Sequence, residues 1–136
     1  MKKASTLCII DDDSVYQFLT TKVVSESKSI ELIGTFSSGL EAIEFFKKNK
    51  NALDKLPDII FLDLTMPIMD GWDFLREYSD IQPTIDKKIT LYIVTSSISP
   101  TDMTRAKSIS VVKDVIVKPV TKEKINYLLK NLEFAI

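Results

Sequence analysis

The sequence has 136 residues, 45% of them hydrophobic and 27% charged, which is typical of one globular domain and leaves no room for a second. Eighteen basic and nineteen acidic residues give a net charge of -1, so nucleic acid and anionic membranes are not expected partners. The chain contains no histidine, which excludes triads and metal sites built on that residue and a phosphohistidine on this chain. The single cysteine, Cys8, is expected to be a buried thiol, and the amino terminus resembles neither a signal peptide nor a membrane span. A cytoplasmic protein is therefore expected.

Five short apolar runs alternate along the chain with amphipathic stretches. The runs predict strands at residues 6–10, 30–36, 59–62, 89–94 and 112–117. Strands that alternate with helices indicate a doubly wound α/β fold, in which a five-stranded parallel sheet carries five helices on its two faces.

The helices are predicted from helical spacing and from capping residues. The first spans residues 14–27 and is predicted from residues that recur at helical spacing, which are Val15, Phe18, Leu19, Lys22 and Val23. The second follows a turn at Gly39 and runs from residue 40 into the polar segment 47–51. Asp70 caps a third helix through residues 72–78, after which a long connection covers residues 79–88. Ser99 and Pro100 open a short fourth helix, and Thr121 caps the last, whose core side carries Ile125, Leu128, Leu129 and Leu132.

Polar side chains follow four of the five predicted strands. Asp11, Asp12 and Asp13 follow the first strand, Asp63 the third, Thr95 and Ser96 the fourth, and Lys118 the fifth. The carboxyl ends of parallel strands meet at one edge of the sheet, where ligands of such folds bind. We therefore expect these groups to converge on one site.

The expected site combines several carboxylates with one lysine. Carboxylates about 4 Å apart repel by roughly 4 kcal/mol at an effective dielectric near 20, so a shared cation is needed. Lys118 supplies one positive charge, and hard carboxylate oxygens are also what Mg²⁺ binds. A site with Mg²⁺, a lysine and a threonine hydroxyl would stabilise the transition state of phosphoryl transfer, with Asp63 as the nucleophile.

The motifs at these strand ends resemble the receiver domain of bacterial two-component response regulators. They are Ile10-Asp11-Asp12, Leu62-Asp63-Leu64-Thr65-Met66-Pro67 with Asp70-Gly71, Val94-Thr95-Ser96, and Val117-Lys118-Pro119. The resemblance covers essentially the whole chain, residues 1–136 with a core at about 6–134, and implies the flavodoxin-like strand order 2-1-3-4-5.

The resemblance also implies a role for each matching residue. Asp63 would accept a phosphoryl group from a sensor histidine kinase or a phosphotransfer protein, and Asp11 and Asp12 would hold Mg²⁺ together with Asp63. The backbone carbonyl of Thr65 would be a further metal ligand. Thr95 would hydrogen-bond the phosphoryl group, and Lys118 would pair with it ahead of a cis bond to Pro119.

Two features depart from the family pattern or vary within it. Many receivers carry an aromatic residue three positions before the lysine, as the ring that moves when the threonine engages phosphate, but this chain has Val115. A β-branched side chain is too stiff for that movement. The switch positions Thr95 and Val115 would therefore have to transmit phosphorylation without the movement of an aromatic ring. Thr65 and Ser96 stand where family members tune the phosphate lifetime, and both are small, so no strong block to hydrolysis is expected.

The chain ends with the last predicted helix, so no output domain is expected and the output would be contact with a protein partner. The resemblance places that contact on the face of the fourth helix, fifth strand and fifth helix. We expect a monomer or a weak, phosphorylation-dependent dimer.

The same residues allow other interpretations. A register slipped by one would make Asp12 and Asp13 the acidic pair, and Asp11 to Asp13 alone would more often cap a helix. Asp63 and Lys118 could form a purely structural ion pair, although buried pairs stabilise poorly. The sequence speaks against an aspartyl phosphatase of the haloacid dehalogenase type, a flavin mononucleotide binder and a calcium loop. The main competing hypothesis is a receiver fold that serves as a docking module without phosphorylation.

Overall fold

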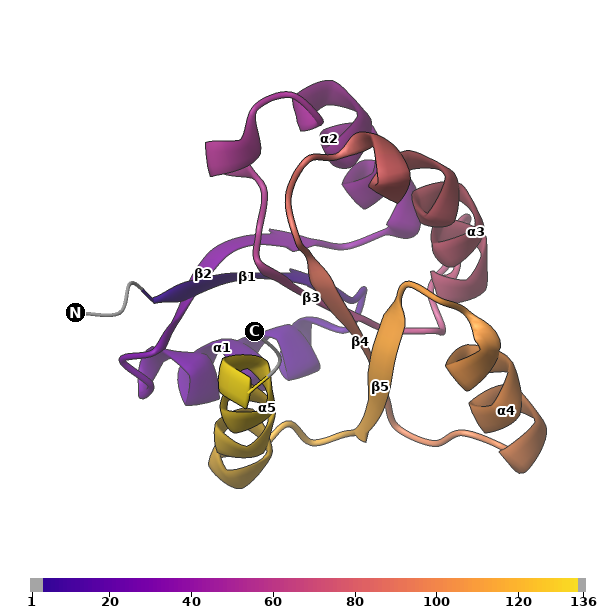
Figure 1. The fold of residues 1–136 in the computed structure, drawn as a ribbon. Helices are drawn as coiled ribbons and strands as arrows, with labels where there is room; N and C mark the ends of the chain where they lie inside the picture. Colours follow the sequence, from indigo (N-terminus) through magenta and orange to yellow (C-terminus); the bar gives the residue numbers. More distant parts are fainter. Residues whose placement is uncertain (1–3, 135–136) are drawn as a thin grey trace.

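The computed structural model describes residues 4–134, and the side chains of residues 4–131. The five strands are β1 (Ser5–Ile10), β2 (Ile30–Phe36), β3 (Ile59–Leu62), β4 (Thr90–Thr95) and β5 (Val112–Val117). They form one parallel sheet in the order β2-β1-β3-β4-β5, which confirms the predicted doubly wound, flavodoxin-like α/β fold (Figure 1).

Four α-helices connect successive strands and a fifth follows β5, and together they cover both faces of the sheet (Figure 1). They are α1 (Ser14–Ser25), α2 (Gly39–Asn49), α3 (Gly71–Ile81), α4 (Pro100–Ser108) and α5 (Lys122–Phe134). One core cluster contains side chains of α2, α3 and α4, including Phe46, Tyr78 and Ala106, and the other contains side chains of α1 and α5, including Val24 and Leu128. The two clusters lie on opposite faces because successive side chains of a strand alternate between faces.

The central strand β3 is the most apolar element. All four of its residues are buried, which explains its uninterrupted hydrophobic sequence, since a central parallel strand is covered on both faces. β5 lies at the edge of the sheet and is only partly buried. Among the described residues no helix has the length and apolar character needed to cross a membrane.

Most predicted boundaries agree with the structure, with small corrections. Gly39 is the first residue of α2, not part of a turn, because the Ser38 side chain accepts a hydrogen bond from the backbone of Glu41 and starts the helix there. The connection after α3 is also shorter than expected, since the helix continues to Ile81 and a 3-10 turn follows at Gln82–Thr84. β4 is shifted by one residue, to Thr90–Thr95.

The helix α1 is confirmed, but of the apolar residues that predicted it only Val23 packs against the core. Val15 and Phe18 are 62% and 67% exposed and Leu19 is 42% exposed, whereas Thr20 and Val24 are buried. The apolar side chains of the first half of α1 therefore face solvent, whereas Val23 and Val24 near its end contact the core. On α5, Ile125 and Leu128 are buried and Leu129 packs against them, as predicted, while the side chain of Leu132 lies outside the described residues.

Candidate functional site

Two neighbouring strands place buried carboxylates side by side. Ile10 and Leu62 are partners at the ends of β1 and β3, and the next backbone N-H, of Asp63, donates to the carbonyl of Ile10 at 2.9 Å. Asp11 and Asp63 thus follow adjacent strands, and they are 4% and 6% exposed. Such burial of acids is unusual unless a cation or donor compensates for it.

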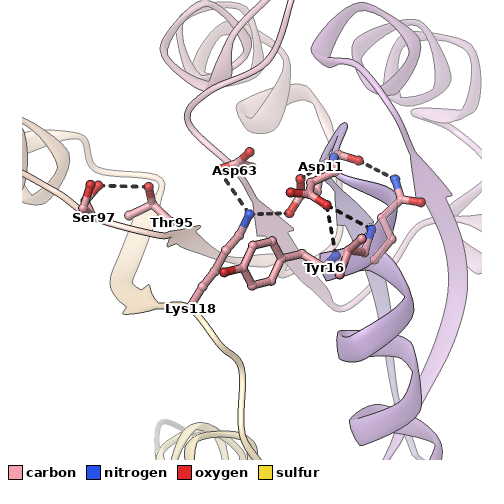
Figure 2. Close-up of polar contacts among 9 residues, drawn as sticks. Asp11, Tyr16, Asp63, Thr95, Ser97 and Lys118 are labelled. Atoms are coloured by element: carbon pink, nitrogen blue, oxygen red, sulfur yellow. Dashed lines mark hydrogen bonds and ion pairs between the residues drawn. The ribbon is translucent and has the colours of Figure 1, made fainter.

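Lys118 brings a single positive charge to both carboxylates (Figure 2). Its Nζ lies 2.8 Å from Oδ2 of Asp11 and 3.7 Å from Oδ1 of Asp63, and its side chain is buried. The backbone N-H of Lys118 donates to the carbonyl of Thr95, which aligns the ends of β5 and β4, and the following bond to Pro119 is cis, as predicted.

The shared lysine does not balance the charge on Asp63. Burial, followed by the negative charge of Asp11, raises the pKa of Asp63 from 3.8 to about 6. Lys118 and the backbone N-H groups of Thr65 and Leu64 oppose this rise in pKa only in part. Asp63 is therefore an acid whose charged form lacks sufficient stabilisation from the protein itself.

Asp12 adds a third carboxylate at the exposed side of this pair. Asp11, Asp12 and Asp63 each offer an oxygen within 4.8 Å of the others, which is an acidic triad able to hold a metal ion. Asp13 does not belong to the triad, since its side chain caps α1 by accepting from the backbone of Val15 and Tyr16. The donor set consists of carboxylate oxygens, which suits a hard divalent cation.

A depression of about 360 Å³ opens beside Asp12 and Asp63 and is bordered by the ends of four strands, β1, β3, β4 and β5. Its lining residues are Asp12, Asp13, Asp63, Thr65, Thr95, Ser96, Ser97 and Lys118. Thr95 is buried, and its hydroxyl donates to the carbonyl of Ser97 at 3.1 Å. Figure 2 shows Thr95 and Ser97 on the far side of Lys118 from Asp11, so the hydroxyl has not joined the carboxylate cluster.

Gly71 explains why the loop after Asp63 can fold so closely over it. A Cβ atom at Gly71 would lie 2.5 Å from the carbonyl oxygen of Asp63 and 2.7 Å from Cα of Leu64, so a side chain cannot be accommodated without a shift. Asp70 and Asp73 form a capping box that starts α3 at this glycine. The Asp70-Gly71 motif thus fixes the path of the loop that carries Thr65.

Val115 lies on β5, half-buried, and packs against the core cluster that contains α2, α3 and α4. It is separated from the depression, whose lining does not include it. Sequence reasoning missed a different aromatic residue at the site, Tyr16, whose ring centroid is 4.2 Å from Nζ of Lys118 (Figure 2). Its position in the first turn of a helix that follows the acidic residues was the available signal.

The comparisons with known proteins decide the family. Residues 7–130 match the model of the response regulator receiver domain. The chain belongs to this family. The receiver is similar to a two component response regulator of Cytophaga hutchinsonii, with 27% identity, a TM-score of 0.84 and coverage of 96% of this chain and 98% of that one. It is also similar to a CheY-like receiver domain protein of Methanospirillum hungatei, with 26% identity, a TM-score of 0.68 and coverage of 95% and 92%.

Among curated proteins, the receiver is similar to a protein-glutamate methylesterase/protein-glutamine glutaminase of Bordetella pertussis. The two are 35% identical over 83 residues, which is 61% of this chain but 22% of that protein. The matched segment therefore covers only about a fifth of that relative.

Proposed function

We propose that this receiver is a phosphorylation-dependent signalling switch in which Asp63 accepts a phosphoryl group from a sensor histidine kinase or a phosphotransfer protein. The observation that carries the proposal is the incomplete neutralisation of Asp63, a buried carboxylate at the mouth of a depression, with Lys118 3.7 Å away. An acid held in this way is suited to react rather than to stabilise the fold.

The proposed reaction follows from the placement of the side chains. A carboxylate oxygen of Asp63 attacks phosphorus, the O-P bond forms, and the P-N bond of the donor's phosphohistidine breaks. Lys118 is placed to pair with a phosphoryl oxygen, and the Thr95 hydroxyl would exchange the Ser97 carbonyl for another phosphoryl oxygen. Thr65 and Ser96, both exposed at the rim, would leave water access for hydrolysis and so tune the phosphate lifetime.

The cofactor of the proposed reaction is Mg²⁺. Asp11, Asp12 and Asp63 would hold the ion, together with the carbonyl of Thr65. When bound, the ion would neutralise the carboxylates and the charge on the phosphoryl oxygens.

The exposed apolar side chains of α1 offer a docking surface for the phosphodonor. Val15, Phe18 and Leu19 are exposed within the two helical turns that follow the acidic residues. Apolar side chains gathered in this way mark protein contacts more often than solvent faces. A donor protein seated on them would bring its phosphohistidine towards Asp63.

A second surface suits a downstream protein target. A groove of about 430 Å³ runs between β5 and α5 and is lined by residues 113–117 of β5 and by Tyr127 and Leu128 of α5. Tyr127 is 66% exposed, and the hydroxyl of Tyr92, which also lines the groove, is buried without a hydrogen-bond partner. This groove is larger than the depression over Asp63 but carries no acidic triad, so we assign it to partner binding. A downstream protein would bind this groove together with α4. Val115, which lies in β5 and lines the groove, would transmit the structural effect of phosphorylation to that surface.

The test is phosphate uptake from acetyl phosphate in the presence of Mg²⁺, followed by intact mass. The wild-type chain is expected to gain one phosphate, and Asp63→Asn none. Asp58→Asn is the matched control, because Asp58 is an aspartate at the other end of β3, away from the depression.

A wild-type chain that binds Mg²⁺ but takes up no phosphate would contradict the proposal. It would instead favour a receiver fold that serves as a docking module. Uptake that persists in Asp63→Asn would place the phosphoacceptor elsewhere.

A further inference from the structure

Lys118 is held by an aromatic ring as well as by carboxylates. The Tyr16 ring centroid lies 4.2 Å from Nζ of Lys118, and Figure 2 shows the ring beside the contacts of the ammonium group with Asp11 and Asp63. Tyr16 is half-buried, and the side chain of Lys118 is buried. A cation over an aromatic face is attracted by the ring quadrupole, most strongly where water is excluded.

The local sequence fixes this ring in place. Asp13 caps α1, and its Oδ1 accepts from the backbone N-H of Val15 at 2.9 Å and of Tyr16 at 3.3 Å. The side chain of Gln17 donates to the carbonyl of Asp11, which ties the first turn of α1 back to the end of β1. Asp13, which the acidic triad leaves out, therefore serves to set the position of the Tyr16 backbone relative to Lys118.

The ring differs from the two carboxylates in how it interacts with the ammonium group of Lys118. Asp11 and Asp63 bind the ammonium group through charged contacts that an incoming phosphoryl group must replace or share. The ring attracts the cation without offering a competing anionic oxygen. It keeps the ammonium at the border of the depression while the N-H groups are redirected to a phosphoryl oxygen.

We propose that Tyr16 is a positioning residue for Lys118, whose ring holds the ammonium group where the phosphoryl oxygen arrives. The inference rests on the proposed phosphoacceptor function and adds a residue on α1 to the groups at the ends of the strands. The aromatic ring, and not the hydroxyl, carries the effect, since the contact is with the ring face.

Two substitutions separate the ring from the hydroxyl and from simple volume. Tyr16→Phe keeps the ring, and Tyr16→Leu keeps an apolar side chain without it. Phosphorylation by acetyl phosphate in Mg²⁺ is followed by intact mass at increasing donor concentrations, which gives the rate constant at saturation and the apparent KM. The Hε signals of Lys118 are measured by NMR without donor and assigned with Lys118→Arg.

We expect Tyr16→Phe to phosphorylate within about twofold of the wild-type rate at saturation, and Tyr16→Leu about tenfold more slowly, which corresponds to about 1.4 kcal/mol. The Mg²⁺ affinity of Tyr16→Leu should stay near the wild-type value, and its Tm should fall only by the loss of the single ring contact with Lys118. The ring current should shift the Lys118 Hε signals upfield in the wild-type chain and in Tyr16→Phe, and not in Tyr16→Leu.

The inference is overturned by Tyr16→Leu phosphorylating at the wild-type rate, or by Tyr16→Phe being as slow as Tyr16→Leu. A parallel loss of Mg²⁺ affinity in Tyr16→Leu, or a loss of Tm as large in Tyr16→Phe as in Tyr16→Leu, would also overturn it, because the effect would then not come from the ring's contact with Lys118. A wild-type chain without phosphate uptake would refute the proposed function and, with it, the role in phosphoryl transfer. If the Lys118 Hε signals of such a wild-type chain were still shifted upfield, the contact between Tyr16 and Lys118 would stand and only the proposed phosphoacceptor function would be refuted.

Discussion

An aspartate lies beyond each end of the strand β3, and the two side chains differ in burial, hydrogen bonds and ion pairs. Asp58, before the strand, accepts hydrogen bonds from the backbone N-H and hydroxyl of Thr6 at 2.8 and 3.1 Å, and Lys87 lies 3.5 Å away. Its side chain is 42% exposed, so water completes its solvation. This acid joins the starts of β1 and β3 and has a structural role.

Asp63, after the strand, is far more buried, and a second carboxylate competes for its cation. Its side chain is 8% exposed and shares Lys118 with Asp11, at the longer distance of 3.7 Å. Burial and the Asp11 charge raise its pKa to about 6. The comparison shows that residue type does not decide the role of an acid. What decides it is whether the protein supplies enough donors, and at Asp63 a cation and a phosphoryl group would have to supply the rest.

The largest expected difference between the two ends of β3 is in the free energy of unfolding that is lost when the lysine at each end is replaced. Lys118→Met should lower the free energy of unfolding by about 2 to 3 kcal/mol, because it leaves two buried carboxylates without a cation. Lys87→Met should cost about 1 kcal/mol, since Asp58 keeps its Thr6 donors and is open to water, although the carbonyls of Leu53 and Leu56 lose a donor. Urea unfolding without metal measures both values.

Mg²⁺ provides the control for the lysine comparison. It should recover part of the stability lost in Lys118→Met and none of that lost in Lys87→Met, because the acidic triad lies at one end only. Equal losses in the two variants would mean that the carboxylates of Asp11 and Asp63 are already satisfied in another way.

A smaller effect is expected from the metal in the unmodified protein. For a dissociation constant on the order of 1 mM, 10 mM Mg²⁺ should add about 1.4 kcal/mol to the free energy of unfolding. Asp12→Asn should reduce this gain, since Asp12 is one of the three acids, whereas Asp58→Asn should leave it unchanged. Thermal unfolding with and without Mg²⁺ measures the gain, and an equal gain in Asp12→Asn would remove this residue from the metal site.

The sequence correctly predicts the fold and the convergence of polar residues at the carboxyl ends of the strands, for a physical reason. Alternating strands and helices leave few topologies, and parallel strands must end at one edge, so the placement of Asp11, Asp63 and Lys118 follows from their positions after apolar runs. The caps Asp70 and Ser99 were predictable in the same way, because a cap depends on nearby residues alone.

What the sequence could not predict depends on the rotation of α1. Val15, Phe18 and Leu19 have the spacing of a buried face, yet the start of α1 turns Thr20 and Val24 inward. The same rotation brings Tyr16 over Lys118, which is a contact between residues far apart in the chain. Asp58 was likewise missed as a structural acid, because its partners Thr6 and Lys87 are distant in sequence.

The smallest expected effect is a pH dependence of stability that arises at Asp63, at the carboxyl end of β3. The pKa of Asp63 in the folded protein is about 6, above its ordinary value of 3.8, so the folded state binds more protons than the unfolded state between these values. The ionised Asp63 therefore lowers stability progressively as the pH rises from about 4 to 6, and the full cost is present at pH 7. Without metal, Asp63→Asn should be more stable than the wild-type chain by about 1 kcal/mol at pH 7, and the gain should vanish near pH 4.

Asp58→Asn should instead lose stability at pH 7, because an amide is a weaker acceptor for Thr6 and forfeits the attraction of Lys87. Urea unfolding at pH 7 checks the opposite signs of the two substitutions, and a series at pH 4, 5, 6 and 7 checks the pH dependence of Asp63→Asn. A destabilised Asp63→Asn at pH 7 would show that Lys118 and the backbone donors already outweigh the burial of Asp63, and the contrast between the two ends of β3 would be lost.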